Sequence, residues 1–235
     1  MRFIFHYPET AGYDGDLLDA GPLPEIAATL DTLSGGRMIL GLGAGFQKSE
    51  FHALGVDFDE RNALVDEALA VLPLHWSGEP FSYTGRHFSA RDVVARPRPV
   101  QRPIPIWVGG NSRLSRRRVT EHAQGWIPMT GGAELSATAR TPELGTVAEL
   151  ARKITEIRAG AAAAGREGHI DLVYSYNPPG ITTPAADAER HRAALAELAQ
   201  AGVDWIVVSG RPGDRRATLD FLAVFGETYL ERSPR

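Results

Sequence analysis

The chain of 235 residues contains no cysteine, which excludes disulfides, thiolate metal sites and a nucleophilic thiol. It also lacks a net positive charge, and its balance of −4 argues against broad electrostatic attraction to nucleic acid or to an anionic membrane. No apolar run approaches membrane-spanning length, and the N-terminus Met1–Pro8 lacks the long apolar core of a signal peptide. These absences lead us to expect a soluble protein of the cytoplasm.

The apolar residues that are present, 43% of the chain, suffice for a sizeable core and follow an alternating pattern. Six short apolar runs predict strands buried on both faces: Phe3–Tyr7, Arg37–Leu42, Ile104–Val108, Gly125–Pro128, Asp171–Ser175 and Asp204–Ser209. Helical patterns cover Ser49–Leu74 with a break near Gly55, Leu114–Ala123, Val147–Ala164, Ala186–Ala201 and Arg216–Leu230. Such alternation favours a parallel α/β sheet, either a barrel or an open doubly wound sheet.

The interval at about 78–103 interrupts this alternation. Phe81–Phe88 predicts a small hairpin, and the proline-rich stretch Arg96–Pro103 cannot form a helix. We interpret the interval as an insertion over one rim of a single domain that covers residues 1–235. The aromatic side chains of the hairpin could form a lid over a substrate or a hydrophobic plug beneath the insertion.

Two glycine-rich turns each follow a predicted strand and open a helix. They are Gly41–Gly45 and Gly109–Ser112. Glycine lets the backbone approach a ligand closely, and a helix N-terminus offers unpaired N–H groups to an anion. Two turns of this kind suggest a phosphate-bearing redox cofactor, although each could also be no more than a tight reversal between strand and helix.

The second turn carries additional signals. Asn111 or Ser112 can cap the following helix, and four arginines crowd its first turns: Arg113, Arg116, Arg117 and Arg118. Cations at a helix N-terminus interact unfavourably with the positive end of the helix dipole. A bound anion would offset this unfavourable interaction. The alternative is that these arginines point outward and pair with acidic neighbours.

The chain offers little in the way of catalytic side chains. Of its seven histidines, only His6 falls at the carboxyl end of a predicted strand, where it could act as an acid or base with Glu9 close behind it. We expect the other six to be solvated or packed. No metal-ligand spacing and no G-x-S-x-G motif occur, so neither a metal site nor a serine nucleophile is predicted.

Several motifs occur in an order that resembles the bacterial luciferase-like monooxygenase family, and its coenzyme F420-dependent branch in particular. They are Ala28–Arg37 running into Leu40–Gly43, Glu50–Val56, Arg96–Gln101, Pro105–Gly110 and Gln124–Pro128. The resemblance covers roughly residues 28 to 230. It implies a TIM barrel with the cofactor across the carboxyl ends of the strands.

The resemblance also implies a chemistry: hydride transfer between F420 and a small organic substrate, with FMN as the alternative cofactor. Gly43 and Gln47 resemble family positions that face the cofactor. Together with the second turn, the expected cofactor-binding residues are Gly43, Gln47, Gly109, Gly110, Asn111, Ser112 and Arg116. The arginine excess modestly favours F420 over FMN.

One segment of the family's pattern is missing. Only about 29 residues separate Tyr7 from Arg37, enough for one helical crossover where the family has two further strand–helix units, or ~70 residues. We therefore expect an incomplete barrel with about six of eight strands and assign no catalytic residue. The exposed strand edges make a homodimer plausible. A truncated, non-catalytic relative is the competing hypothesis, and an unrelated doubly wound binding protein is a third.

Overall fold

The computed structural model describes residues 2–6, 23–183, 186–209 and 214–230. Its contacts divide the chain into two compact units. The terminal unit comprises Met1–Asp14, Gly145–Thr155 and Asp171–Arg235, and the middle unit comprises Gly15–Leu144 and Glu156–Ile170. The expectation of a single domain over residues 1–235 stays a prediction.

Three parallel strands form the sheet of the middle unit in the order β2-β5-β6. They are β2 (Leu40–Leu42), β5 (Ile106–Gly109) and β6 (Gly125–Ile127). Leu42 pairs with Val108, and Gly109 pairs with Ile127, so the carboxyl ends of all three strands lie side by side. The side chains of β5 are buried on both faces, as the continuous apolar run predicts.

The helices of the middle unit include those predicted within Ser49–Leu74 and Leu114–Ala123, to which the structure adds α1, η2 and α5. In chain order, the helices are α1 (Leu23–Ser34), α2 (Lys48–Ala53), a 3₁₀ turn η2 (Phe58–Glu60), α3 (Arg61–Trp76), α4 (Arg113–Glu121) and α5 (Ala133–Thr138). The predicted break near Gly55 is confirmed, with φ +66° at that glycine. The sequence did not predict α5, because six residues are too few to show a helical period.

Strand β2 is shorter than the predicted strand Arg37–Leu42. Gln101 explains the difference, because its side-chain amide donates to the carbonyl of Met38 at 2.7 Å and takes the place of a strand partner. The same amide and the backbone N–H of Gln101 donate to the two oxygens of the fully buried Asp31, at 2.7 and 2.9 Å. The carboxylate of Asp31 therefore joins the motif Ala28–Arg37 to the motif Arg96–Gln101.

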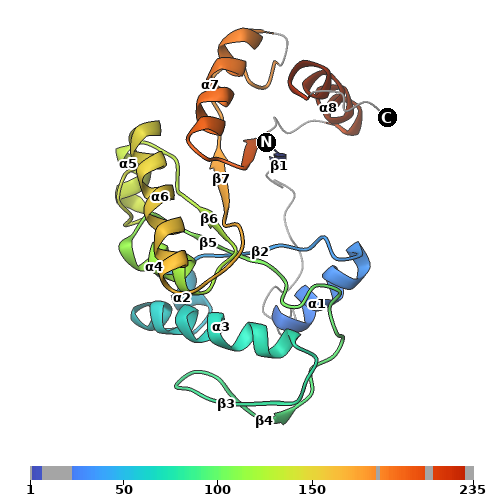
Figure 1. The fold of residues 1–235 in the computed structure, drawn as a ribbon, viewed down its shortest axis with the longest axis vertical. Coiled ribbons are helices and arrows are strands. Elements are labelled where there is room, and N and C mark those ends of the chain that lie inside the picture. The colour runs from blue at the N-terminus through green and yellow to red at the C-terminus, as the bar shows by residue number, and fades with distance from the viewer. Residues whose placement is uncertain (1, 7–22, 184–185, 210–213, 231–235) are drawn as a thin grey trace. The chain divides into compact units, whose positions relative to one another are not determined.

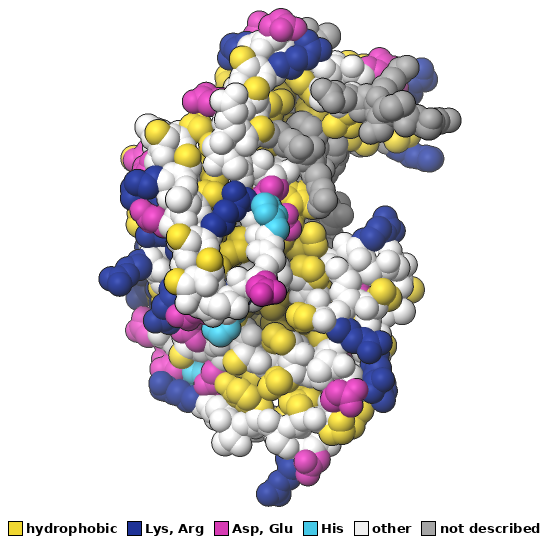
Figure 2. Space-filling model, in the orientation of Figure 1, with side chains coloured by type: hydrophobic (Ala, Val, Ile, Leu, Met, Phe, Trp, Pro, Cys, Tyr) yellow, Lys and Arg dark blue, Asp and Glu magenta, His cyan; other side chains and the backbone are white. Residues whose placement is uncertain are grey.

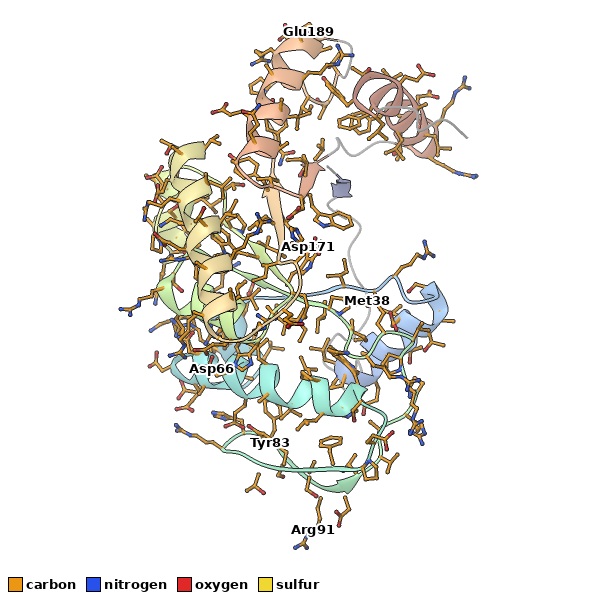
Figure 3. All side chains as sticks on the ribbon, in the orientation of Figure 1. Met38, Asp66, Tyr83, Arg91, Asp171 and Glu189 are labelled. Atoms are coloured by element: carbon orange, nitrogen blue, oxygen red, sulfur yellow. The ribbon has the colours of Figure 1, made fainter. Side chains whose placement is uncertain are left out.

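The predicted hairpin is present and lies beside α3 (Figure 1). Its strands are β3 (Phe81–Thr84) and β4 (Ser89–Val93), paired antiparallel. The Glu67 carboxylate of α3 accepts the backbone N–H groups of Arg86, His87 and Phe88 at 2.8, 3.0 and 3.2 Å. Tyr83 points toward α3, whereas Arg91 points away from it (Figure 3). The hairpin is thus fastened to α3 by its tip and by an aromatic side chain.

The terminal unit holds the other three parallel strands, in the order β1-β8-β7. These are β1 (Arg2–His6), β7 (Asp171–Ser175) and β8 (Trp205–Ser209), with the helices α7 (Ala188–Gln200) and α8 (Arg215–Tyr229). Helix α6 (Val147–Ala163) contributes residues to both units. All six predicted strands are confirmed, and the chain has an incomplete α/β barrel fold, with six parallel strands in the residues that the structure describes.

On the surface that Figure 2 draws, Lys and Arg side chains are interspersed with Asp and Glu, while apolar side chains gather over α3 and the hairpin. In the described ranges, no helix combines the length and the apolar character needed to cross a membrane.

Candidate functional site

The structure brings the two glycine-rich turns to the same edge of the sheet in the middle unit. Because Leu42 pairs with Val108, the turn after β2 and the turn after β5 follow neighbouring strand ends. A Cβ added to Gly109 would lie 3.6 Å from the carbonyl oxygen of Leu42 and 3.9 Å from that of Ile127. Gly109 thus sits between the carboxyl ends of β2 and β6.

Gly110 is the residue of the second turn that most requires glycine. Its φ is +103°, and a Cβ would lie 3.0 Å from the hydroxyl of Ser115. Its N–H donates to the carbonyl of Ile127 at 3.0 Å, and its carbonyl accepts the indole N–H of the fully buried Trp126 at 2.9 Å. Trp126 is thus a core residue whose contact with the turn the sequence did not reveal.

Asn111 fastens the turn to the loop that follows β6. Its side-chain amide donates to the carbonyls of Met129 and Pro142 at 2.9 and 2.8 Å, and its side-chain oxygen accepts the N–H of Met129 at 2.9 Å. Its backbone N–H donates to the hydroxyl of Thr141 at 2.9 Å. Asn111 is completely buried and committed to protein groups, so its contact with a cofactor stays a prediction.

Of the two caps that the sequence allows, Asn111 and Ser112, it is Ser112 that caps α4. Its hydroxyl accepts the backbone N–H of Ser115 at 3.0 Å. The backbone N–H groups of Ser112, Arg113 and Leu114 have no acceptor in the part of the chain that the structure describes. They form the electropositive end of a nine-residue helix, which is a suitable place for an anion.

The four arginines of α4 differ in their contacts, and Arg113 is exposed. Arg117 pairs with Glu121 at 3.5 Å, and Arg118 pairs with Asp66 of α3 at 2.6 Å. These two pair with acidic neighbours, as the alternative predicts, but Arg118 is buried and does not point outward. Arg116 instead reaches back and donates to the carbonyl of Asn111 at 2.5 Å, which holds its charge beside the turn.

The turn after β2 has weaker support. A Cβ on Gly43 would meet no atom within 4 Å, and only Gly45, with φ +72° and the ring of Phe51 against it, requires glycine. Gln47 is the exposed N-cap of α2 and makes no side-chain capping bond. Because α2 has only six residues, its N-terminus offers less to an anion than that of α4.

No catalytic role is assigned to the histidines whose side chains the structure describes. His6 ends β1 opposite Ser209 of β8, while its side chain and Glu9 lie outside the described residues. His191 is packed as expected: it is fully buried, and its Nδ1 lies 2.8 Å from the hydroxyl of Tyr176, just after β7. Burial, assisted by the charge of Arg190, lowers the pKa of His191, and burial raises the pKa of Tyr176.

Known proteins share this arrangement of motifs and strands. The family model described as luciferase-like monooxygenase matches residues 23–219. The chain belongs to this family. The resemblance found in the motifs is therefore confirmed.

The names of individual relatives refer to two different cofactors, FMNH2 and F420. The chain is 30% identical to the "FMNH(2)-dependent dimethylsulfone monooxygenase" of Pseudomonas putida over 176 residues, covering 73% of this chain and 43% of that protein. It is 32% identical to the "F420-dependent glucose-6-phosphate dehydrogenase" of Beutenbergia cavernae over 180 residues, covering 75% and 50%. The crystal structure of the monooxygenase RslO1 from Streptomyces bottropensis shares the fold, with a TM-score of 0.67, 19% identity and coverage of 88% and 72%. The chain spans about half the length of the curated relatives it matches.

Proposed function

We propose that this chain is a flavin- or deazaflavin-dependent oxidoreductase that transfers a hydride between F420 and a small organic substrate, with FMN as the alternative cofactor. One observation carries the proposal: a capped, electropositive helix N-terminus follows β5, between the carboxyl ends of two neighbouring strands. Relatives named for F420 and for FMNH2 support the class of cofactor.

The residues at this edge fit the phosphate group that both cofactors carry. Three backbone N–H groups, those of Ser112, Arg113 and Leu114, are available to its oxygens. The glycine at position 110 leaves room for close approach, and Arg116 adds a positive charge at the turn. Charge-assisted hydrogen bonds of this kind contribute about 1.5–3 kcal/mol each.

When bound, the cofactor would supply the hydride chemistry. In this account the chain's own residues bind and orient it: the α4 N-terminus and Arg116 hold the phosphate, while Gly43 and Gln47 border the same edge from the side of β2. No catalytic side chain is assigned, because the family's second and third strand–helix units, which lie near the cofactor ring, have no counterpart between Tyr7 and Arg37.

The same gap favours a second candidate function, a truncated relative that binds cofactor weakly and does not catalyse. Six parallel strands occupy the described residues, besides the two antiparallel strands of the hairpin, against the eight parallel strands of a complete barrel. Fewer strands leave less of the carboxyl rim on which a cofactor ring can rest.

For the quaternary state we propose a homodimer formed through α1. Leu23, Ile26, Leu30 and Leu33 are all exposed on this helix and follow one another at intervals of three, four and three residues. The intervals are the same in either direction, so a second copy running antiparallel would place Leu23 opposite Leu33 and Ile26 opposite Leu30. Light scattering should give the mass of a dimer for the natural chain and of a monomer for Leu30→Glu.

A fluorescence titration with F420, and separately with FMN, tests the enzyme proposal. We expect low-micromolar binding of F420, weakened at least about tenfold in Arg116→Gln because one charge-assisted bond is lost. Arg91→Gln, which removes an exposed charge far along the hairpin, is the matched control. If a folded sample binds neither cofactor, the truncated-relative hypothesis takes its place.

A further inference from the structure

Three cations converge on the ring of Phe58 in the middle unit. The guanidinium carbon of Arg61 lies 3.8 Å from the ring centroid, that of Arg140 lies 5.3 Å away, and the ammonium of Lys48 lies 5.2 Å away. The ring of Phe51 packs edge-on against Phe58 with centroids 5.3 Å apart. The cations come from α2, α3 and the loop after α5, so the fold gathers them from three separate segments.

None of the three cations forms an ion pair with a described residue. No carboxylate of a described residue lies within ion-pair distance of Lys48, Arg61 or Arg140; Arg61 donates to the carbonyl of Phe58 at 2.8 Å. Asp57 and Asp59 flank Phe58 along the chain without pairing with these cations, and Glu60 pairs with side chains of residues 86 and 87 in the hairpin. Cation–π contact with one ring offsets only part of the mutual repulsion of three charges.

Arg140 is held there against its backbone preference. It follows the last turn of α5 with φ +51°, and its N–H donates to the carbonyl of Ala137 at 3.2 Å while that of Thr141 donates to Ser136 at 3.0 Å. This is the left-handed position at a helix end that glycine usually occupies. A non-glycine residue in this conformation is strained, and such strain is concentrated at functional positions.

The cluster adjoins the edge already described. Thr141 hydrogen-bonds to the backbone of Asn111 in the turn after β5, and Lys48 is the first residue of α2 after the turn that follows β2. Lys48 and Arg140 are exposed, whereas Phe58 beneath them is buried. A small molecule could therefore reach the charges, and the ring would form the floor beneath it.

We propose that Lys48, Arg61 and Arg140 form an anion-binding site on Phe58, separate from the cofactor-phosphate turn, for a carboxylate or phosphate group of a small-molecule ligand. An anion here relieves the repulsion among the three cations and gains charge-assisted hydrogen bonds. The inference does not depend on the proposed function, since the cluster stands on its own contacts.

Calorimetric titration with inorganic pyrophosphate, and in parallel with tricarballylate, tests the site at low ionic strength, where screening is weakest. The variants are Arg140→Gly and the control Arg91→Gln. We expect Arg140→Gly to lower the affinity for the tighter-binding probe at least about fivefold. Arg91→Gln should change that affinity less than about twofold. A preference for pyrophosphate assigns the site to phosphate groups, and a preference for tricarballylate assigns it to carboxylates.

Two further measurements keep the result unambiguous. Arg140→Gly should raise the melting temperature by about 2 °C, because glycine adopts the left-handed conformation without strain, and this confirms an intact fold. Gly110→Ala, which obstructs the cofactor turn, should leave the Arg140-dependent binding in place and so separates the two sites. Equal affinity of the natural chain and Arg140→Gly for both probes, or no binding of either, overturns the proposal.

Discussion

The two glycine-rich turns look alike in the sequence and differ in the structure. The turn after β5 is held by Trp126 and Asn111 and leads into a capped helix of nine residues. The turn after β2 leads into a helix of six residues without a side-chain cap, and a Cβ added to Gly43 would meet no atom within 4 Å. Glycine permits a binding turn, but the surrounding hydrogen bonds determine whether its N–H groups are held in place for a ligand.

The largest expected effect comes from Gly110→Asp. The substitution forces a side chain into a backbone conformation with φ +103°, against Ser115, and adds a negative charge where we propose that the phosphate binds. We expect cofactor affinity to fall at least about 100-fold, as measured by fluorescence titration. Far-ultraviolet circular dichroism of the variant serves as the control for folding. Unchanged affinity in a folded variant would remove the turn after β5 from the site.

Asn111→Ala tests the support of that turn. The change removes three buried side-chain hydrogen bonds, two to Met129 after β6 and one to Pro142 after α5, worth about 1 kcal/mol each, so the free energy of unfolding should fall by about 3 kcal/mol. Urea denaturation measures the loss. Asn177→Ala is the matched control, because Asn177 is exposed and its side chain accepts one bond, from the N–H of Ser209. If the free energy of unfolding falls no more than in the control, the hydrogen bonds of the Asn111 side chain are not what stabilises the turn.

Glu67 already demonstrates in this chain how three backbone N–H groups hold an anion. Desolvation raises the pKa of its carboxyl, but the N–H groups of His87, Arg86 and Phe88 together outweigh it, so the pKa is lowered. Because the pKa is lowered on folding, the stabilisation is present above the unfolded value of about 4.3 and is lost as the pH falls through the folded value. Glu67→Gln should therefore lower the melting temperature modestly at pH 7, and the difference should disappear as the pH falls through the folded pKa of Glu67. A difference from the natural chain that is independent of pH would contradict this assignment.

The smallest effect is expected for Gly43→Ala. Its backbone is not in the left-handed region and the space around a methyl group is open, so stability should change by less than about 0.5 kcal/mol and cofactor affinity by less than about twofold. The same titration measures it. A tenfold loss would show that a ligand contacts the backbone at Gly43, and would reverse the ranking of the two turns.

The sequence predicted much of the fold because apolar runs and glycine stops are local signals. All six strands follow from them, and β2 is shorter than predicted because the carbonyl of Met38 bonds to Gln101, which lies 63 residues away. The candidate site was predicted only in outline. The contacts of Trp126 and Thr141 with the turn, and of Arg118 with Asp66, join residues far apart in sequence, so no local pattern records them.

The proposed binding of the cofactor phosphate at the turn after β5 is tested by the dissociation constants of FMN and of riboflavin, which lacks the phosphate. Both are measured in the natural chain and in Gly110→Asp. We expect the natural chain to bind FMN at least about tenfold more tightly than riboflavin, and the ratio to fall to about one in the variant. Equal affinity for FMN and riboflavin in the natural chain would mean that this turn does not bind the phosphate.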